Sequence, residues 1–222
     1  MRRLHHFQLS PFCRKVRLVM AEKKLVFESV PEKPWEPKAE LFPLDPSGQL
    51  PVVIEDGGFR ISDSQAIAEY VEELHPDPPL LPKRPTDRAE VRRLTAWFDR
   101  FFFGEVTSTV IREKLLKRYA NAAPPPDLAA LRRSLESMRN HMGFIVKLLE
   151  QRDNLAGPLS LADFTAAAHL SCVDYFGDVP WDAFPKAKEW YARLKSRPSF
   201  RTLLTDNLPG IAPPAHYANL DF

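Results

Sequence analysis

Apolar positions follow two different spacings along the chain, and the change between them falls near residue 80. Before that point, short apolar runs alternate with segments in which apolar side chains recur every three or four residues, as expected for strands and helices. After it, only the helical spacing recurs. The pattern therefore predicts an α/β domain over residues 1–76, a linker over 77–86 and an all-helical domain over 87–206.

The first part is expected to fold in the order β-α-β followed by ββ-α. The turn Asp56-Gly57-Gly58 separates two short apolar runs, which is a hairpin pattern. In the first helix the basic side chains of Arg14, Lys15 and Arg17 lie largely off the apolar face. The predicted strands are 4–8, 27–30, 50–55 and 59–61, and the predicted helices are 13–22 and 64–74.

The second part is expected to contain four longer helices and a short final one. They are predicted to run from Thr86 or Asp87 to about residue 119, from Asp127 to about 151, from Ser160 onward, over 184–195, and from Ser199 onward. The tail, which we define as residues 207–222, is expected to be irregular and to contain no helix. Its Pro209-Gly210 and Pro213-Pro214 pairs interrupt the chain there.

Composition narrows the possible classes of protein. Hydrophobic residues make up 44% of the 222 residues, so a core can form, and a net charge of +2 gives no basic surplus for a nucleic-acid binder. No apolar run approaches the roughly 18 residues of a membrane span, and the N-terminal segment lacks an apolar signal region. Cys13 and Cys172 have neither disulfide-framework nor metal-ligand spacing. We expect a cytoplasmic protein without a resident metal or cofactor.

Three short segments carry candidate chemistry. Ser10 lies between the first strand and the first helix, where its hydroxyl either caps the helix or donates a hydrogen bond to a bound thiolate. Pro51 opens an apolar strand, and the Leu50–Pro51 bond is either an ordinary trans bond or a cis bond that exposes the Leu50 backbone. Asp63 and Ser64 begin a helix, as a plain cap or as a site for a carboxylate and an ammonium.

In this order and spacing the three segments resemble the glutathione S-transferase family, and the resemblance covers nearly the whole chain. The segment around Ser160 and Asp163 is similar to that family's buried capping box. Trp190 to Phe200 is similar to its final helices. The resemblance implies a thioredoxin-like α/β domain followed by an all-α domain, and a homodimer.

The resemblance also implies a glutathione site. In it Ser10 stabilises the glutathione thiolate, and the Leu50 main chain, next to Pro51, pairs with the cysteinyl backbone. Asp63 and Ser64 hold the γ-glutamyl end, and Gln49 stands where a polar ligand contact is common. Glutathione would be a co-substrate. The run Phe101-Phe102-Phe103 either lines a pocket for the electrophile or packs in the core and a dimer interface.

A narrower resemblance concerns the tail. Residues 215–222 together with 174–181 resemble alphaproteobacterial members of this fold that bind the tubulin-like division protein FtsZ. The residues that this implies as partner contacts are His216, Tyr217, Leu220, Asp221 and Phe222. Trp35, in the loop after the second predicted strand, is expected to serve either a ligand or a partner surface. Aromatic side chains of this kind dominate interfaces. The alternative is that the tail folds back on its own helical domain.

Two functions follow from these resemblances, and a third interpretation is a purely structural dimer that serves another partner. One is a cell-division regulator that binds FtsZ filaments at the division site with little or no enzymatic activity. The other is an active glutathione transferase that conjugates glutathione to small electrophiles, with Ser10 as the activating hydroxyl. The residues of the first domain do not distinguish these functions, because a protein can keep the fold and the site residues of an enzyme after it has lost the catalytic activity.

Overall fold

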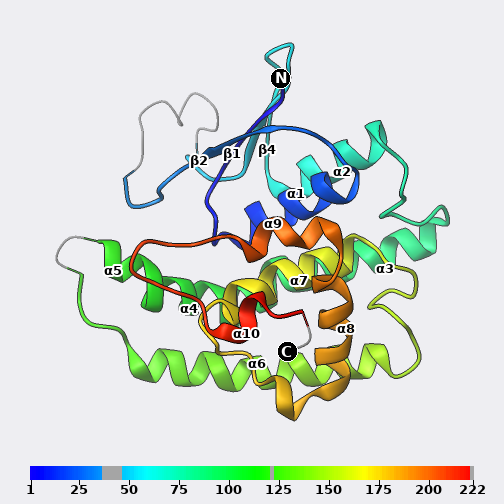
Figure 1. Ribbon diagram of the computed structural model, residues 1–222. Coiled ribbons are helices and arrows are strands. Elements are labelled where there is room, and N and C mark those ends of the chain that lie inside the picture. The colour runs from blue at the N-terminus through cyan, green and yellow to red at the C-terminus, as the bar shows by residue number, and fades with distance from the viewer. Residues whose placement is uncertain (37–46, 121–122, 221–222) are drawn as a thin grey trace.

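The computed structural model describes residues 1–36, 47–120 and 123–220 (Figure 1). In this part of the chain a four-stranded sheet has the order β2-β1-β3-β4. Its strands are β1 (Arg3–His6), β2 (Glu28–Pro31), β3 (Val52–Ile54) and β4 (Arg60–Ser62). The β1–β2 pair is parallel and the other pairs are antiparallel, with Leu4 opposite Ser29 on one side and Val53 on the other. The predicted α/β first domain is confirmed.

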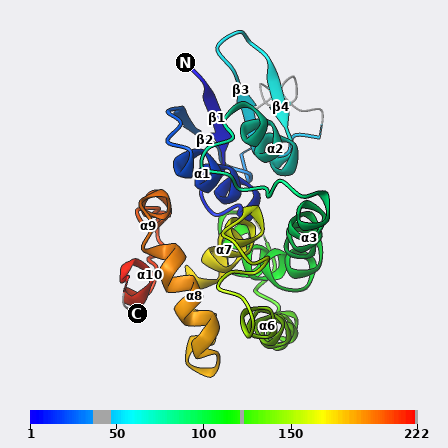
Figure 2. The same cartoon turned by 90° about the vertical axis from the view of Figure 1, so that its right-hand side faces the viewer.

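Two helices cover the face of the sheet that looks toward the helical domain. These are α1 (Pro11–Glu22) and α2 (Ser64–Leu74), which lie between the sheet and α7 (Leu161–Asp174) in Figure 2. Helix α1 begins two residues before its predicted start, and α2 has the predicted bounds. Proline occupies the first turn of α1, where a missing N–H costs nothing.

The helical domain is built around one long helix and the buried helix α7. The long helix runs without interruption from residue 85 to residue 119, close to its predicted range. Its successive segments are α3 (Pro85–Ala96), a π-helical stretch (Trp97–Thr107), α4 (Ser108–Ile111), a second π-helical stretch (Arg112–Leu116) and α5 (Lys117–Tyr119). It is followed by α6 (Leu128–Leu149), α8 (Pro185–Lys195) and α9 (Arg201–Leu204), with short 3₁₀ turns at Trp181–Ala183 and Pro198–Phe200. Asp127 caps α6, as predicted. None of the helices in the described ranges is long and apolar enough to cross a membrane.

Helix α7 is the centre of the core, because all of its residues are buried. Its start is fixed by the predicted capping box. The Asp163 carboxylate accepts hydrogen bonds from the Ser160 backbone N–H at 3.0 Å and from the Ser160 hydroxyl at 3.0 Å. It also accepts from Leu155 N–H and from the Trp190 indole N–H, at 2.9 and 3.1 Å. One buried carboxylate therefore links α7 to α8 and to the loop that precedes α7.

The tail departs from its prediction. The expectation of no helix there was wrong, because α10 (Ala215–Ala218) forms one turn directly after Pro214. Proline is tolerated at that position because the first N–H groups of a helix have no partner within it. The described part of the tail is docked on its own domain. Tyr217 is fully buried, its hydroxyl donates to Leu203 O at 3.0 Å, and the Arg14 guanidinium lies 5.9 Å above its ring.

Candidate functional site

A cleft of about 670 Å³ lies between the two domains. Its first wall comes from the segment before β3 and from the start of α2, and its second wall comes from the long helix of the second domain. Five residues that the sequence predicted for a glutathione site line it together: Gln49, Leu50, Pro51, Asp63 and Ser64. The sequence therefore identified most of the first wall.

The two backbone features expected at this wall are present. The Leu50–Pro51 bond is cis, which settles the alternative left open by the sequence. Asp63 has a φ of 72°, a conformation that short polar side chains tolerate by bonding locally. Its carboxylate accepts from Gln65 N–H at 2.8 Å and from Ala66 N–H at 2.9 Å. Asp63 thus caps α2, while Ser64 is buried beside the cleft.

Ser10 stands apart from the other predicted residues, because it is not among the side chains that line the cleft. Its Oγ accepts a hydrogen bond from Cys13 N–H at 3.3 Å, so it caps α1. Cys13 itself is buried, and burial raises the pKa of its thiol to about 11. The thiol is therefore protonated near neutral pH. Because the nucleophile in thiol chemistry is the thiolate anion, Cys13 is not suited to that role. Phe12 is the residue of this turn that lines the cleft.

The second wall of the cleft is polar, which the sequence did not predict. Asp99 lines it, held between Lys15 Nζ at 2.5 Å and His169 Nε2 at 3.2 Å. Burial raises the pKa of Asp99, but Lys15 and His169 outweigh burial and leave that pKa below its usual value. Beside it, Arg92 forms a two-pronged ion pair with Glu69 of α2, at 2.9 and 2.5 Å. These ion pairs join residues that are far apart in the sequence, so no local motif predicts them.

The three phenylalanines of the long helix separate in the structure. Phe102 is fully buried, Phe103 contacts Phe12 with ring centroids 4.8 Å apart, and Phe101 is 57% exposed. None of the three lines the cleft directly. Phe102 therefore serves core packing, and Phe103 packs on the cleft residue Phe12.

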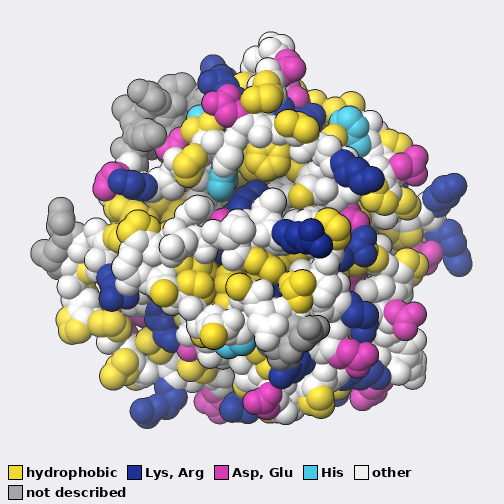
Figure 3. Space-filling view, viewed as in Figure 1, with side chains coloured by type: hydrophobic (Ala, Val, Ile, Leu, Met, Phe, Trp, Pro, Cys, Tyr) yellow, Lys and Arg dark blue, Asp and Glu magenta, His cyan; other side chains and the backbone are white. Residues whose placement is uncertain are grey.

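Four predicted partner residues are described by the structure, and they are Trp35 in the loop after β2 and His216, Tyr217 and Leu220 in the tail. Trp35 is half-buried and stacks on Tyr119, with ring centroids 4.2 Å apart, and the Tyr119 hydroxyl donates to Pro209 O at 2.5 Å. A loop after β2, the end of the long helix and the start of the tail therefore meet at one place. Figure 3 shows hydrophobic side chains gathered over the tail and the helices beneath it, with charged side chains around them.

The end of the tail is held by polar contacts. His216 Nε2 lies 3.0 Å from Asp174 Oδ1, and Lys195 Nζ donates to His216 O at 2.8 Å. Burial lowers the pKa of Lys195 to about 8. Leu220 is half-buried, and the predicted contacts Asp221 and Phe222 lie outside the described residues. The buried Tyr217 anchors the tail instead of presenting its ring to solvent.

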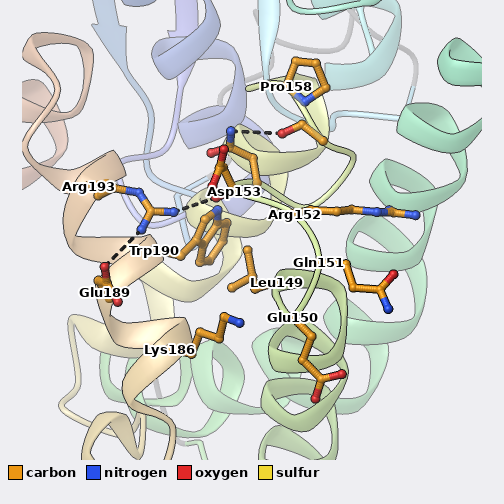
Figure 4. Close-up of a pocket in the computed structure, with 12 residues that line it drawn as sticks. Leu149, Glu150, Gln151, Arg152, Asp153, Pro158, Lys186, Glu189, Trp190 and Arg193 are labelled. Atoms are coloured by element: carbon orange, nitrogen blue, oxygen red, sulfur yellow. Dashed lines mark hydrogen bonds and ion pairs between the residues drawn. The ribbon is translucent and has the colours of Figure 1, made fainter.

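A second cavity, of about 770 Å³, lies between the end of α6 and α8 (Figure 4). Charged side chains line it, and several are already paired. Arg193 lies 3.6 Å from Glu189 and donates to Asp153 O at 2.6 Å. None of the site residues predicted from the sequence lines this cavity. Within the described ranges, no group of three or more His, Cys, Asp or Glu side chains is placed to hold a metal ion.

Comparisons with known proteins agree with this geometry. A family model described as the N-terminal domain of glutathione S-transferase matches residues 4–79. FtsZ-localized protein A from Caulobacter vibrioides is 52% identical over all of this chain and 98% of its own length. A solved glutathione S-transferase from Rhodospirillum rubrum F11 is 50% identical with a TM-score of 0.96, and each chain is covered completely. The structure of FzlA from C. crescentus is 51% identical, also with a TM-score of 0.96, over 100% of this chain and 99% of that one.

Proposed function

Because this chain belongs to the glutathione S-transferase superfamily and keeps its two-domain fold, we propose that it uses that fold as a scaffold for binding FtsZ filaments in cell division. The observation that carries the proposal is the full-length similarity, at 52% identity, to FtsZ-localized protein A. The similarity covers the tail as well as both domains. The protein would act in the cytoplasm at the division site, as a homodimer, with little or no enzymatic activity.

The partner surface in this proposal is the face where Trp35, Tyr119 and the tail meet. The Trp35 ring stacks on Tyr119, and because Trp35 is only half-buried, part of its side chain stays accessible. Interfaces of this type concentrate their binding energy in a few aromatic anchors. His216 and Leu220 would contact the partner together with Asp221 and Phe222. Tyr217 would position the tail, because its own side chain is buried.

A chain that ends at Ala215 is expected to lose FtsZ binding, because it lacks every proposed contact of the tail. Trp35→Ala is expected to weaken binding by about tenfold or more, as the loss of an aromatic anchor does. Co-sedimentation with FtsZ filaments measures both. Leu128→Ala is the matched control, because Leu128 is an apolar residue 71% exposed at the start of α6. Undiminished sedimentation of both a folded truncated chain and Trp35→Ala would contradict the proposed surface.

A second candidate function is glutathione conjugation, which is favoured by the five predicted residues that line one wall of the cleft. In this alternative the chain binds glutathione along the Leu50 backbone and the start of α2. Ser10 Oγ can accept from Cys13 N–H and still donate its own O–H to a bound thiolate, but Ser10 is not among the residues that line the cleft. Its position outside the lining is the reason for placing the transferase second.

If the transferase function holds, Ser10→Ala should lower the conjugation rate by about 10²-fold, the effect of losing one hydrogen bond to a reacting anion. Isothermal titration with millimolar glutathione and a conjugation assay measure binding and rate. Asp127→Ala is the control, because it also removes a helix cap, on α6, without touching the cleft. Absence of any binding heat at millimolar glutathione would eliminate this candidate.

A further inference from the structure

A groove of about 430 Å³ beside the tail is distinct from both the interdomain cleft and the Trp35 contact. Its floor comes from the loop that joins α7 to α8, and its sides come from three helices. Arg139 of α6, Lys188 of α8 and His216 of α10 stand around it. The tail thus builds one side of the groove, and a chain without the tail has no complete groove.

The floor of the groove is apolar and firmly held. It contains Val179, which is 7% exposed, and Trp181, which is 5% exposed. The Trp181 ring stacks on Tyr191 with centroids 4.6 Å apart, and its indole N–H donates to Asp174 Oδ1 at 2.7 Å. The same carboxylate oxygen contacts His216, so the floor and the tail side share one anchor. A floor fixed in this way needs little ordering when a ligand binds.

Arg139 and Lys188 face one carboxylate, Asp182, among the residues that line the groove, so the rim carries one positive charge in excess. Arg139 is exposed, and no ion-pair partner for it occurs among the described residues. Lys188 contacts Asp182 at 3.2 Å, but the Asp182 side chain is 99% exposed, so water competes for this pair and it holds little energy. An apolar floor that contains tryptophan, with arginine on its rim, is the composition of binding hot spots.

We propose that this groove binds a short acidic segment of the filament-forming partner. A carboxylate of the segment pairs with Arg139, and a neighbouring apolar side chain covers the small part of Val179 and Trp181 that stays exposed. The inference rests on the proposed function and adds to it the chemistry that the tail helps to recognise. Arginine suits the role because its planar fork of donors matches a carboxylate.

Charge reversal at the rim tests this assignment. Arg139→Glu is expected to weaken FtsZ filament binding by about tenfold or more, because a carboxylate of the partner then meets a like charge. Arg139→Lys should retain most of the binding. The matched control is Arg133→Glu, which makes the same charge change six residues earlier on α6 and outside the groove. Binding by the native chain should weaken as salt rises, and that salt dependence should become shallower in Arg139→Glu.

The outcomes separate this inference from the function on which it rests. If the native chain does not sediment with filaments, the proposed function fails and the groove loses its partner. If the native chain binds and Arg139→Glu binds equally well, the function stands and the groove assignment is overturned. Equal losses in Arg139→Glu and Arg133→Glu would also overturn it, since they would indicate general electrostatic attraction.

Discussion

Asp206→Ala is expected to lower the free energy of unfolding by about 3–5 kcal/mol, a large share of the roughly 5–15 kcal/mol that stabilises an ordinary domain. Its carboxylate is the shared partner of two buried guanidinium groups. Arg14 Nη2 lies 3.0 Å from Oδ2, while Arg17 contacts Oδ2 at 2.8 Å and Oδ1 at 2.9 Å. Arg14 is fully buried, and Asp206 is 5% exposed. Removing the carboxylate leaves two desolvated cations close together without their counter-ion.

Asp206 lies where the two domains and the tail meet, so its loss is expected to destabilise the whole protein. Asp206 follows α9, at the base of the tail, whereas both arginines belong to α1 of the first domain. The ion pairs therefore fasten the sheet domain to the helical domain and to the tail. The Arg14 guanidinium also faces the ring of Tyr217, so the same change should loosen the docked tail.

Urea unfolding followed by circular dichroism measures the effect. Asp206→Asn should fall between the native protein and Asp206→Ala, because an amide oxygen still accepts a hydrogen bond but carries no charge. Asp182→Ala is the control, since it removes a carboxylate that is 99% exposed and pairs only at the surface with Lys188. A midpoint for Asp206→Ala equal to that of Asp182→Ala would mean that the arginines find other partners or water.

These arginines also show where sequence reasoning reaches its limit. Periodicity correctly placed Arg14, Lys15 and Arg17 off the apolar face of α1, which for most helices means a solvent-exposed face. In this protein that side packs on the second domain, and all three side chains are buried. Their partners Asp206 and Asp99 lie 84 to 192 residues away in the sequence. Hydrophobic spacing describes one element at a time, so it cannot show such pairs.

The same limit applies to the cleft. The wall from the first domain was predictable, because its residues belong to short segments in which backbone geometry and side chain type are coupled, such as Leu50-Pro51 and Asp63-Ser64. The opposite wall consists of isolated polar positions on a long helix, including Arg92 and Asp99. Nothing in their neighbours along the chain distinguishes them from exposed polar residues. For Ser10 the sequence leaves two alternatives, and the cap is the contact that the structure contains.

The start of helix α7 was predicted from its capping residues and not from hydrophobic spacing. All of its residues are buried, so it has no polar face and its spacing is uninformative. Its beginning was nevertheless predicted, since a serine followed three residues later by an aspartate specifies a capping box whatever the burial. The tail shows the opposite case. Its prolines predicted an irregular chain, and the short helix α10 begins where the last of them ends.

Asp163→Ala is the second change for which we expect a loss of about 3–5 kcal/mol in the free energy of unfolding. The carboxylate is fully buried and accepts four hydrogen bonds, from Leu155 N–H, from the N–H and hydroxyl of Ser160, and from the Trp190 indole. Alanine would leave these donors buried without an acceptor, and each unsatisfied donor costs about 1–3 kcal/mol. Partial relaxation of the loop and entry of water reduce their sum to the range given.

Asp127→Ala is the matched control for this loss, because Asp127 caps α6 with one hydrogen bond to Ala130 N–H at an exposed helix start. Its removal should cost about 1 kcal/mol. Asp163→Asn should remain strongly destabilising, since its NH₂ group would face donors that need an acceptor. Urea midpoints compare the three variants at equal protein concentration. Equal midpoints for Asp163→Ala and Asp127→Ala would show that the buried network contributes no more than an ordinary cap.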